Sequence, residues 1–157
     1  MRYGAVADAG PLIHLSEIDS LGFCSLFDPL ILPSAVYNEL DRGGLPDEMQ
    51  QLGYEVVEIE DTPMGSNELE VGERQAIALA EERELLLLTD DLAARNAAIE
   101  RGIEVHGSIG VIVFGFAQGE IQKQEAASLM RALQYETSLF ITEGVVEQGV
   151  KLLDSTV

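Results

Sequence analysis

Short apolar runs alternate along the chain with stretches whose apolar positions recur at helical spacing. The apolar runs predict strands over residues 3–7, 29–32, 54–59, 85–88 and 103–105. The helical spacing predicts helices over residues 10–18, 21–27, 33–40, 67–83, 91–100, 108–117, 123–133 and 142–153. Because strands and helices alternate, the pattern indicates an α/β domain with a parallel sheet.

Two of the predicted strands differ in the surface they should bury. Residues 85–88 are four leucines, which is typical of a central parallel strand covered on both faces. Residues 54–59 alternate apolar and acidic side chains, so we expect a half-exposed strand at an edge of the sheet. The turn-rich segment 61–67 is too short to divide domains, and we expect residues 1–157 to form a single domain.

Two helix starts carry capping signals. Asn67 and Glu70 have the spacing of a capping box, in which each side chain accepts a hydrogen bond from the other residue's backbone. Ser108 stands at the start of an apolar helical stretch, where a serine hydroxyl commonly accepts a hydrogen bond from the first turn. We therefore expect helices to begin at these two positions.

The composition excludes several classes of protein. A hydrophobic fraction of 46% supplies a core and excludes wholesale disorder. The single cysteine, Cys24, excludes a disulfide framework and a cysteine-based zinc site. No apolar run approaches the roughly 20 residues that span a bilayer, and the first residues lack the layout of a signal peptide. We expect a soluble cytoplasmic protein with no membrane association.

The charge is strongly acidic, with 28 Asp and Glu against 9 Lys and Arg and a net charge of −19. Proteins that bind nucleic acids usually carry a basic stripe, so this balance argues against easy binding. The acids either form a solvating coat suited to high salt or pair with a basic partner. Because they are scattered along the chain rather than gathered in a tail, the coat, and hence a halophilic source, is the favoured hypothesis.

Candidate chemistry begins where two predicted strands end in acid. Asp8 follows the first strand, and Thr89, Asp90 and Asp91 follow the leucine strand. Ligands of open α/β sheets bind beyond the carboxyl ends of the strands, so these carboxylates share one edge if both strands are central. The alternative at each position is an aspartate that only caps the next helix.

Two glutamates flank apolar helix faces. Glu73 lies four residues after Leu69 and three before Ala76, and Glu39 lies three residues after Val36. Such carboxylates either reach water at the helix boundary or need a partner, and the chain has few cations to offer. An acidic cluster with little histidine matches Mg²⁺ or Mn²⁺. These ions lower the pKa of bound water and assist phosphoryl displacement.

Four segments together resemble the PIN-domain nucleases, in particular the VapC-like branch DUF3368. They are residues 8–13 (DAGPLI), 32–40 (LPSAVYNEL), 72–80 (GERQAIALA) and 87–91 (LLTDD). Residues 107–112 (GSIGVI), 119–121 (GEI) and Arg95 echo the later part of that branch, so the resemblance covers nearly the whole chain. It implies a three-layer α/β/α sandwich around a parallel sheet and a Mg²⁺- or Mn²⁺-dependent ribonuclease.

The resemblance also implies roles for individual residues. Asp8, Glu39, Glu73 and Asp91 match the family's catalytic, metal-binding acids, and Asp90 is the neighbouring acid that either binds metal or supports the site. Thr89 matches a hydroxyl that orients the site. From its position one turn after Asp91, and not from the resemblance, we expect Arg95 to contact either an RNA phosphate or a carboxylate of the cluster. Relatives that are toxins pair with small antitoxins and form dimers, so the resemblance implies an RNA substrate, an antitoxin partner and a homodimer.

One departure from the family pattern keeps other functions open. Many relatives have serine or threonine two residues after the first aspartate, where this chain has Gly10. The alternatives are a PIN-like module that binds a protein partner without catalysis, and a metal-dependent phosphatase. We interpret His14 as a hydrogen-bonded helix residue rather than a catalytic base.

Overall fold

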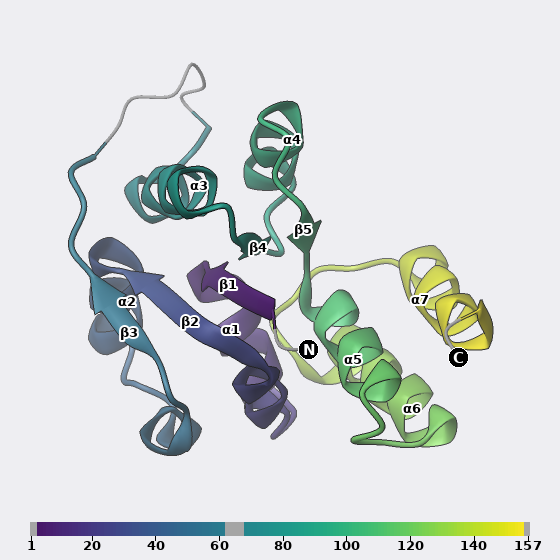
Figure 1. Ribbon diagram of the computed structural model, residues 1–157. Helices are drawn as coiled ribbons and strands as arrows, with labels where there is room; N and C mark the ends of the chain where they lie inside the picture. The colour runs from purple at the N-terminus through teal and green to yellow at the C-terminus, as the bar shows by residue number, and fades with distance from the viewer. Residues whose placement is uncertain (1–2, 62–67, 156–157) are drawn as a thin grey trace.

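The computed structural model describes residues 3–61 and 68–155. Five parallel strands form one sheet in the order β3-β2-β1-β4-β5 (Figure 1). Their bounds are β1 Tyr3–Ala7, β2 Phe27–Pro33, β3 Glu55–Val57, β4 Leu86–Leu88 and β5 Val105–His106. The predicted central leucine strand, β4, lies between β1 and β5, and the predicted edge strand, β3, lies at one edge, so both predictions are confirmed.

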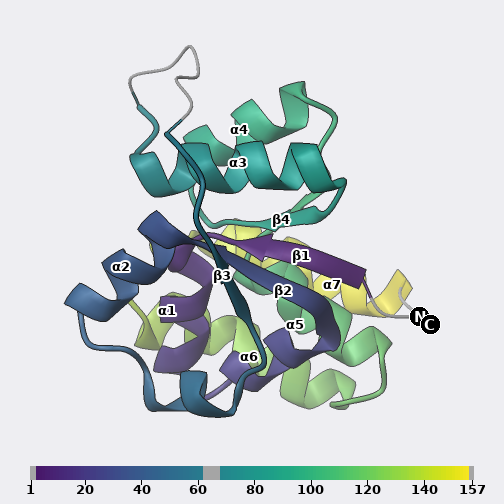
Figure 2. The ribbon, with the colours of Figure 1, turned by 60° about the vertical axis from the view of Figure 1, so that its left-hand side comes forward.

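Helices cover both faces of the sheet. They are α1 Ala9–Glu17, α2 Ser34–Arg42, α3 Val71–Arg83, α4 Leu92–Glu100, α5 Ser108–Ala117, α6 Lys123–Glu136 and α7 Glu143–Ser155, with 3-10 helices at Leu21–Leu26 and Asp47–Gln51. In Figure 2, α3 and α4 lie above the sheet, and α1, α2, α5 and α6 lie below it. The predicted three-layer α/β/α sandwich is confirmed.

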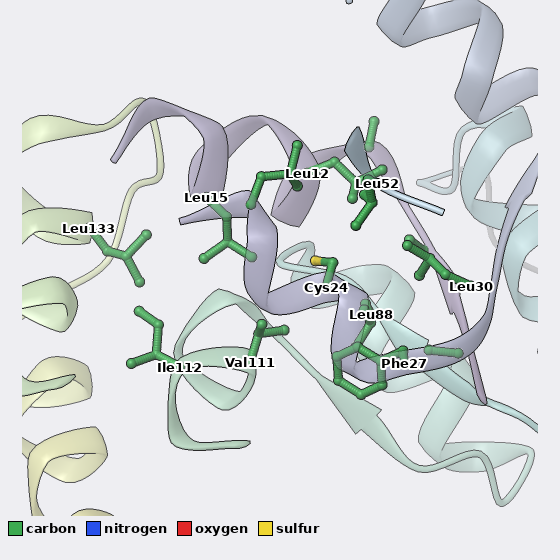
Figure 3. Close-up of a cluster of buried hydrophobic side chains, with 14 of the residues drawn as sticks. Leu12, Leu15, Cys24, Phe27, Leu30, Leu52, Leu88, Val111, Ile112 and Leu133 are labelled. Carbon is green, nitrogen blue, oxygen red and sulfur yellow. The ribbon is translucent and has the colours of Figure 1, made fainter. Parts of the chain in front are cut away.

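Alternate strand residues supply two separate cores, because successive side chains of a strand point to opposite faces. Val6, Ile31 and Leu87 contact the layer that contains α3 and α4. The residues on either side of them in the strands, such as Ala7 and Leu88, join the larger core on the other face. Figure 3 shows that core, in which Leu12, Leu15 and Cys24 pack with Leu30, Leu88, Val111 and Ile112.

The start of α3 differs from the prediction. Its first residue is Val71, and Glu70 is the N-cap residue of a capping box with Glu73. The backbone N–H of Glu70 donates to Glu73 Oε1 over 2.8 Å. The predicted box paired Glu70 with Asn67, which lies outside the described residues. The prediction of a helix start near residue 67 was therefore wrong, because Glu73 satisfies the backbone of Glu70 and residues 68–70 are not helical.

Two further predictions need correction. Residues 21–26 form a 3-10 helix, and Phe27 already begins β2, two residues before the predicted strand. Ser108 is the first residue of α5 and not its cap, since Gly107 occupies the N-cap position. The Ser108 hydroxyl instead donates to Asp90 Oδ2 over 2.5 Å, so a tertiary contact replaces the expected local one.

Within the described residues, no helix is both long and apolar enough to cross a membrane.

Candidate active site

The strand order indicates a binding site at the junction between β1 and β4. From β1 the chain builds β2 and β3 on one side, and it then returns to place β4 on the other side of β1. Ligands of open α/β sheets bind at such a switch point, beyond the carboxyl ends of the strands. Ala7 pairs with Leu88, and the N–H of Asp8 donates to the Leu88 carbonyl over 2.8 Å. Asp8 and Thr89 therefore leave the sheet side by side.

A hydrogen-bonded chain fixes the aspartate at the end of β1. Asp8 Oδ1 accepts from the backbone N–H of Ala9 over 2.8 Å, and Oδ2 accepts from the Thr89 hydroxyl over 2.9 Å. The Thr89 oxygen in turn accepts from the backbone N–H of Asp91 over 3.2 Å. Thr89 has no exposed surface and Asp8 is only 8% exposed, so this buried hydroxyl links the ends of both strands.

Acids from two helices face the same opening. A pocket of about 240 Å³ is lined by Asp8, Glu39, Glu73 and Asp91, together with Gly10, His14, Glu70, Gly72, Asp90, Ser138, Leu139 and Phe140. Glu39 comes from α2 and Glu73 from the first turn of α3, two helices that pack against each other. No lysine or arginine lines this pocket in the described part of the chain. The four predicted acids are thus brought together without a lysine or arginine among them in the described residues.

Burial makes the aspartate at the bottom of the pocket hard to ionise. Desolvation is the main cause that raises the pKa of Asp8 from 3.8 to about 6, and the hydrogen bonds from Thr89 and Ala9 lower it only in part. The negative charges of Glu39 and Asp91 raise it further. In the absence of a cation, Asp8 is therefore half protonated at about pH 6.

The two glutamates are perturbed in the same direction. Burial is also the main cause that raises the pKa of Glu73, and Asp8 and Asp91 add repulsion. Asp91 also shares a hydrogen bond with Glu73, which favours the protonated form of Glu73. The pKa of Glu39 is raised by burial and by Glu70, with Arg42 acting in the opposite direction. Accumulated negative charge is therefore the dominant electrostatic property of this pocket.

These residues fit a hydrated divalent cation. The acids offer only oxygen ligands, which Mg²⁺ and Mn²⁺ prefer, and a cation would relieve the repulsion that raises their pKa values. Among residues 3–61 and 68–155, no three His, Cys, Asp or Glu side chains are already arranged as a set of metal ligands. A Mg²⁺ ion usually keeps several waters and takes one or two carboxylates, so a closed cage is not required.

The neighbouring acid, Asp90, is held by three donors. Its Oδ1 accepts from the backbone N–H of Ser108 over 2.7 Å, and its Oδ2 accepts from the Ser108 hydroxyl and from His14 Nδ1 over 2.5 and 2.7 Å. Asp90 therefore joins α1 to the start of α5. A Cβ on Gly107 would lie 2.6 Å from Asp90 Oδ1, which explains the glycine at that position. The interpretation of His14 as a hydrogen-bonded helix residue is confirmed by this geometry.

Asp91 and Arg95 have different surroundings. Asp91 is the N-cap residue of α4, and its Oδ2 accepts from the backbone N–H of Ala94 over 2.9 Å while the residue also lines the carboxylate pocket. The sequence left open whether Asp91 caps a helix or belongs to a ligand site. In the structure Asp91 caps α4 and also lines the pocket. Arg95 is exposed on α4 and lines a neighbouring groove instead of the carboxylate pocket.

Sequence reasoning missed one part of the pocket wall, the segment Ser138–Phe140 between α6 and α7. This segment is about 130 residues from Asp8 in the chain, and it contains no charged residue or motif. The packing of α6 and α7 against α5 and the hydrogen bonds of Ser138 to Glu17 bring it to the site. Glu70 was also missed as a lining residue, because it was interpreted only as part of a helix cap.

Comparison with known proteins agrees with the fold and identifies the family. Residues 4–155 match the model of the family DUF3368, described as a PIN domain. A solved structure with a similar fold is a PilT N-terminus domain protein, SSO1118, from the hyperthermophilic archaeon Sulfolobus solfataricus P2. The similarity covers 68% of this chain and 88% of that one, with 23% identity and a TM-score of 0.58. No curated protein matches the chain.

PIN domains have a nuclease-type fold; they are typically metal-dependent nucleases that act on nucleic acids with the help of divalent metal ions. The match spans nearly all of the described chain, and the resemblance expected from its motifs is confirmed. The chain belongs to the DUF3368 family of PIN domains.

Proposed function

We propose that this protein is a metal-dependent endoribonuclease. One observation carries the proposal: Asp8, Glu39, Glu73 and Asp91, from four separate segments, line one pocket at the switch point of a PIN-domain sheet. In the described residues no lysine or arginine lines that pocket, so a divalent cation is the partner that best compensates its charge.

We assign metal binding to these four acids. Asp8 and Glu73 are buried, at 8% and 9% exposure, and form the inner part of the site, whereas Glu39 and Asp91 lie at its exposed rim. Thr89 keeps Asp8 oriented through its hydroxyl. Since both oxygens of Asp90 already accept hydrogen bonds from His14 and Ser108, we assign it the role of holding the β4–α4 connection in place.

The reaction proposed for this pocket is hydrolysis of a phosphodiester. A bound Mg²⁺ or Mn²⁺ would supply a water of lowered pKa and compensate the charge of the phosphate. The attacking water forms a new bond to phosphorus, and the bond from phosphorus to the 3′ oxygen breaks. The attacking water gives up a proton and the leaving 3′ oxygen takes one up, so the products are a 5′-phosphate and a 3′-hydroxyl. No cyclic phosphate forms, because no step uses the ribose 2′-hydroxyl.

We further propose that the protein is the toxin of a toxin–antitoxin pair. In the described residues no lysine or arginine lines the pocket, so its carboxylates are suited to an arginine inserted by a small partner protein. Such an arginine would form paired hydrogen bonds with a carboxylate. Such a partner would block the site that RNA needs. A homodimer is also part of the proposal, and analytical ultracentrifugation of the purified chain tests it.

Cleavage of a mixed pool of structured RNAs tests the enzymatic proposal. We expect cutting that requires Mn²⁺ or Mg²⁺ and that Asp8→Asn abolishes. Glu82→Gln is the matched control, because Glu82 is an exposed acid of α3 outside the pocket. Assays at low and at molar salt show whether the acidic surface is adapted to screening. Folded protein that cuts no RNA under any condition would overturn the proposal, and hydrolysis of a generic phosphomonoester alone would favour a phosphatase.

A further inference from the structure

A second cavity adjoins the carboxylate pocket. This groove of about 550 Å³ runs between the start of α4, α5 and α7, and we call it the α5–α7 groove. Asp90, Leu139 and Phe140 line both cavities, so the groove continues directly from the pocket. Its other lining is largely apolar, from residues such as Ile109, Ile141, Val145 and Leu152. Arg95 is the only lysine or arginine that lines it in the described part of the chain.

Phe140 is presented to solvent by a segment that is itself anchored. Its side chain is 96% exposed, whereas its neighbours Leu139 and Ile141 pack against the core. Before it, the Ser138 hydroxyl donates to Glu17 Oε1 over 2.7 Å, and the N–H of Leu139 donates to Thr137 Oγ1 over 3.1 Å. An exposed apolar residue alone needs no explanation. This ring, however, stands on a fixed segment where the pocket meets the groove.

The charge of the protein restricts how it can hold a polyanion. With a net charge of −19 and a pocket lined by carboxylates, phosphate contacts by themselves favour binding weakly. A nucleobase is neutral, and stacking on an aromatic ring does not depend on the protein's charge. The α5–α7 groove offers such a ring with a single cation beside the apolar wall. This combination matches one nucleotide, with the base on the ring and the phosphate near the guanidinium.

We propose that Phe140 and Arg95 form a nucleotide-binding subsite beside the carboxylate pocket. The Phe140 ring stacks on an unpaired base next to the scissile phosphodiester, and the Arg95 guanidinium binds a neighbouring phosphate. This inference rests on the proposed nuclease function and assigns recognition of an unpaired base to Phe140 and Arg95. A base inside a duplex is stacked on its neighbours and cannot reach the ring.

The chain contains no tryptophan, which permits a direct test. Phe140→Trp, made in an Asp8→Asn background that prevents cleavage, carries a single tryptophan fluorophore at the proposed subsite. In Mg²⁺, we expect a single-stranded RNA octamer to quench its fluorescence and a hairpin stem of the same sequence to leave it unchanged. Tyr135→Trp in the same background is the control, because Tyr135 is 74% exposed on α6 and lines neither cavity.

Affinities separate stacking from charge. Phe140→Ala should weaken binding of the octamer about ten-fold, with Phe140→Tyr restoring it and Tyr135→Ala having no effect. Arg95→Gln should lower the slope of log affinity against log salt by about 0.7, the contribution of one phosphate contact on a single strand. Phe140→Ala should leave that slope unchanged. Arg83→Gln is the control, since Arg83 is exposed and lines neither cavity.

The outcomes distinguish this inference from the proposed function. RNA that the native protein cleaves but that does not quench the Phe140→Trp variant overturns the subsite and leaves the nuclease standing. Quenching by RNA without cleavage by the native protein supports the subsite and contradicts the nuclease. A DNA octamer that quenches equally supports stacking and shows that the subsite does not read the 2′-hydroxyl. Saturating RNA that changes no signal overturns the subsite.

Discussion

The buried Asp8 carboxylate makes the stability of the metal-free protein depend on pH. Its pKa is raised from 3.8 to about 6, mainly by burial. At about 1.4 kcal/mol per pH unit, this difference corresponds to about 3 kcal/mol. Because the folded state binds the proton more tightly than the unfolded chain, this contribution is fully present below pH 3.8 and is lost as the pH rises through about 6.

Asp8→Asn removes the ionisation and preserves the size of the side chain. Relative to its value below pH 3.8, the free energy of unfolding of the native protein is lowered by the raised pKa of Asp8. The loss is about 1.6 kcal/mol at pH 5 and about 3 kcal/mol at pH 8. The free energy of unfolding of the variant, minus that of the native protein, should therefore rise by about 1.4 kcal/mol between these pH values. An amide nitrogen in place of Oδ2 cannot accept from the Thr89 hydroxyl, which costs about 1 kcal/mol at both pH values and cancels in this comparison.

Urea unfolding followed by circular dichroism, in EDTA at pH 5 and pH 8, measures these differences. Glu82→Gln serves as the control, because Glu82 is an exposed acid of α3 outside the carboxylate pocket. The variant also loses the repulsion between Asp8 and Glu73, which lessens the rise in the pKa of Glu73 and changes the difference in the same direction. We expect the difference in free energy of unfolding between Asp8→Asn and the native protein to grow from pH 5 to pH 8. A difference that stays constant or becomes smaller would refute the assignment of Asp8 as a buried carboxylate with a raised pKa.

Metal binding, the Asp90 contact and the acidic surface each give one further prediction. Mn²⁺ should raise the melting temperature more at pH 8 than at pH 5.5, because the carboxylates must lose protons to bind it. If Mn²⁺ raises the melting temperature of Asp8→Asn as much as that of the native protein, binding at this pocket is contradicted. Gly107→Ala should lower the free energy of unfolding by about 1–3 kcal/mol in urea, because its Cβ would displace Asp90 Oδ1 from the backbone of Ser108. Gly53→Ala should leave the free energy of unfolding unchanged, because an added Cβ there has no atom within 4 Å. Equal losses of free energy in the two variants would refute the clash with Asp90 as the cause. Raising KCl from 0.1 M to 2 M should raise the melting temperature, since the screening length falls from about 10 Å to below 3 Å, and indifference to salt would exclude the acidic coat as a salt adaptation.

Local patterns were sufficient for most of the fold. The leucine strand and the alternating edge strand could be predicted because burial on two faces and on one face leave different periods in the sequence. The positions of Asp8 and Thr89 at strand ends followed from the same patterns. Parallel pairing of β1 with β4 then placed these residues at one edge of the sheet.

Helix starts were less predictable, because they depend on which side chain reaches which backbone group. Glu70 is at capping distance in the sequence from both Asn67 and Glu73, and its backbone N–H bonds to Glu73 Oε1 at the start of α3. Ser108 had the signature of a cap, yet its hydroxyl bonds to Asp90, 18 residues earlier. A long-range acceptor is invisible to a local pattern.

The sequence by itself determined the elements, the layer order implied by them, and the identity of four acids at strand ends and on helix faces. Only the tertiary structure decided that both oxygens of Asp90 are held by His14 and Ser108, although Asp90 and Asp91 both line the pocket. It alone also placed Phe140 beside the acids. The physical reason is the separation along the chain of the residues that meet. Periodicity shows whether a residue is buried, whereas the site depends on contacts between segments up to about 130 residues apart. Packing of the helices on the sheet establishes these contacts.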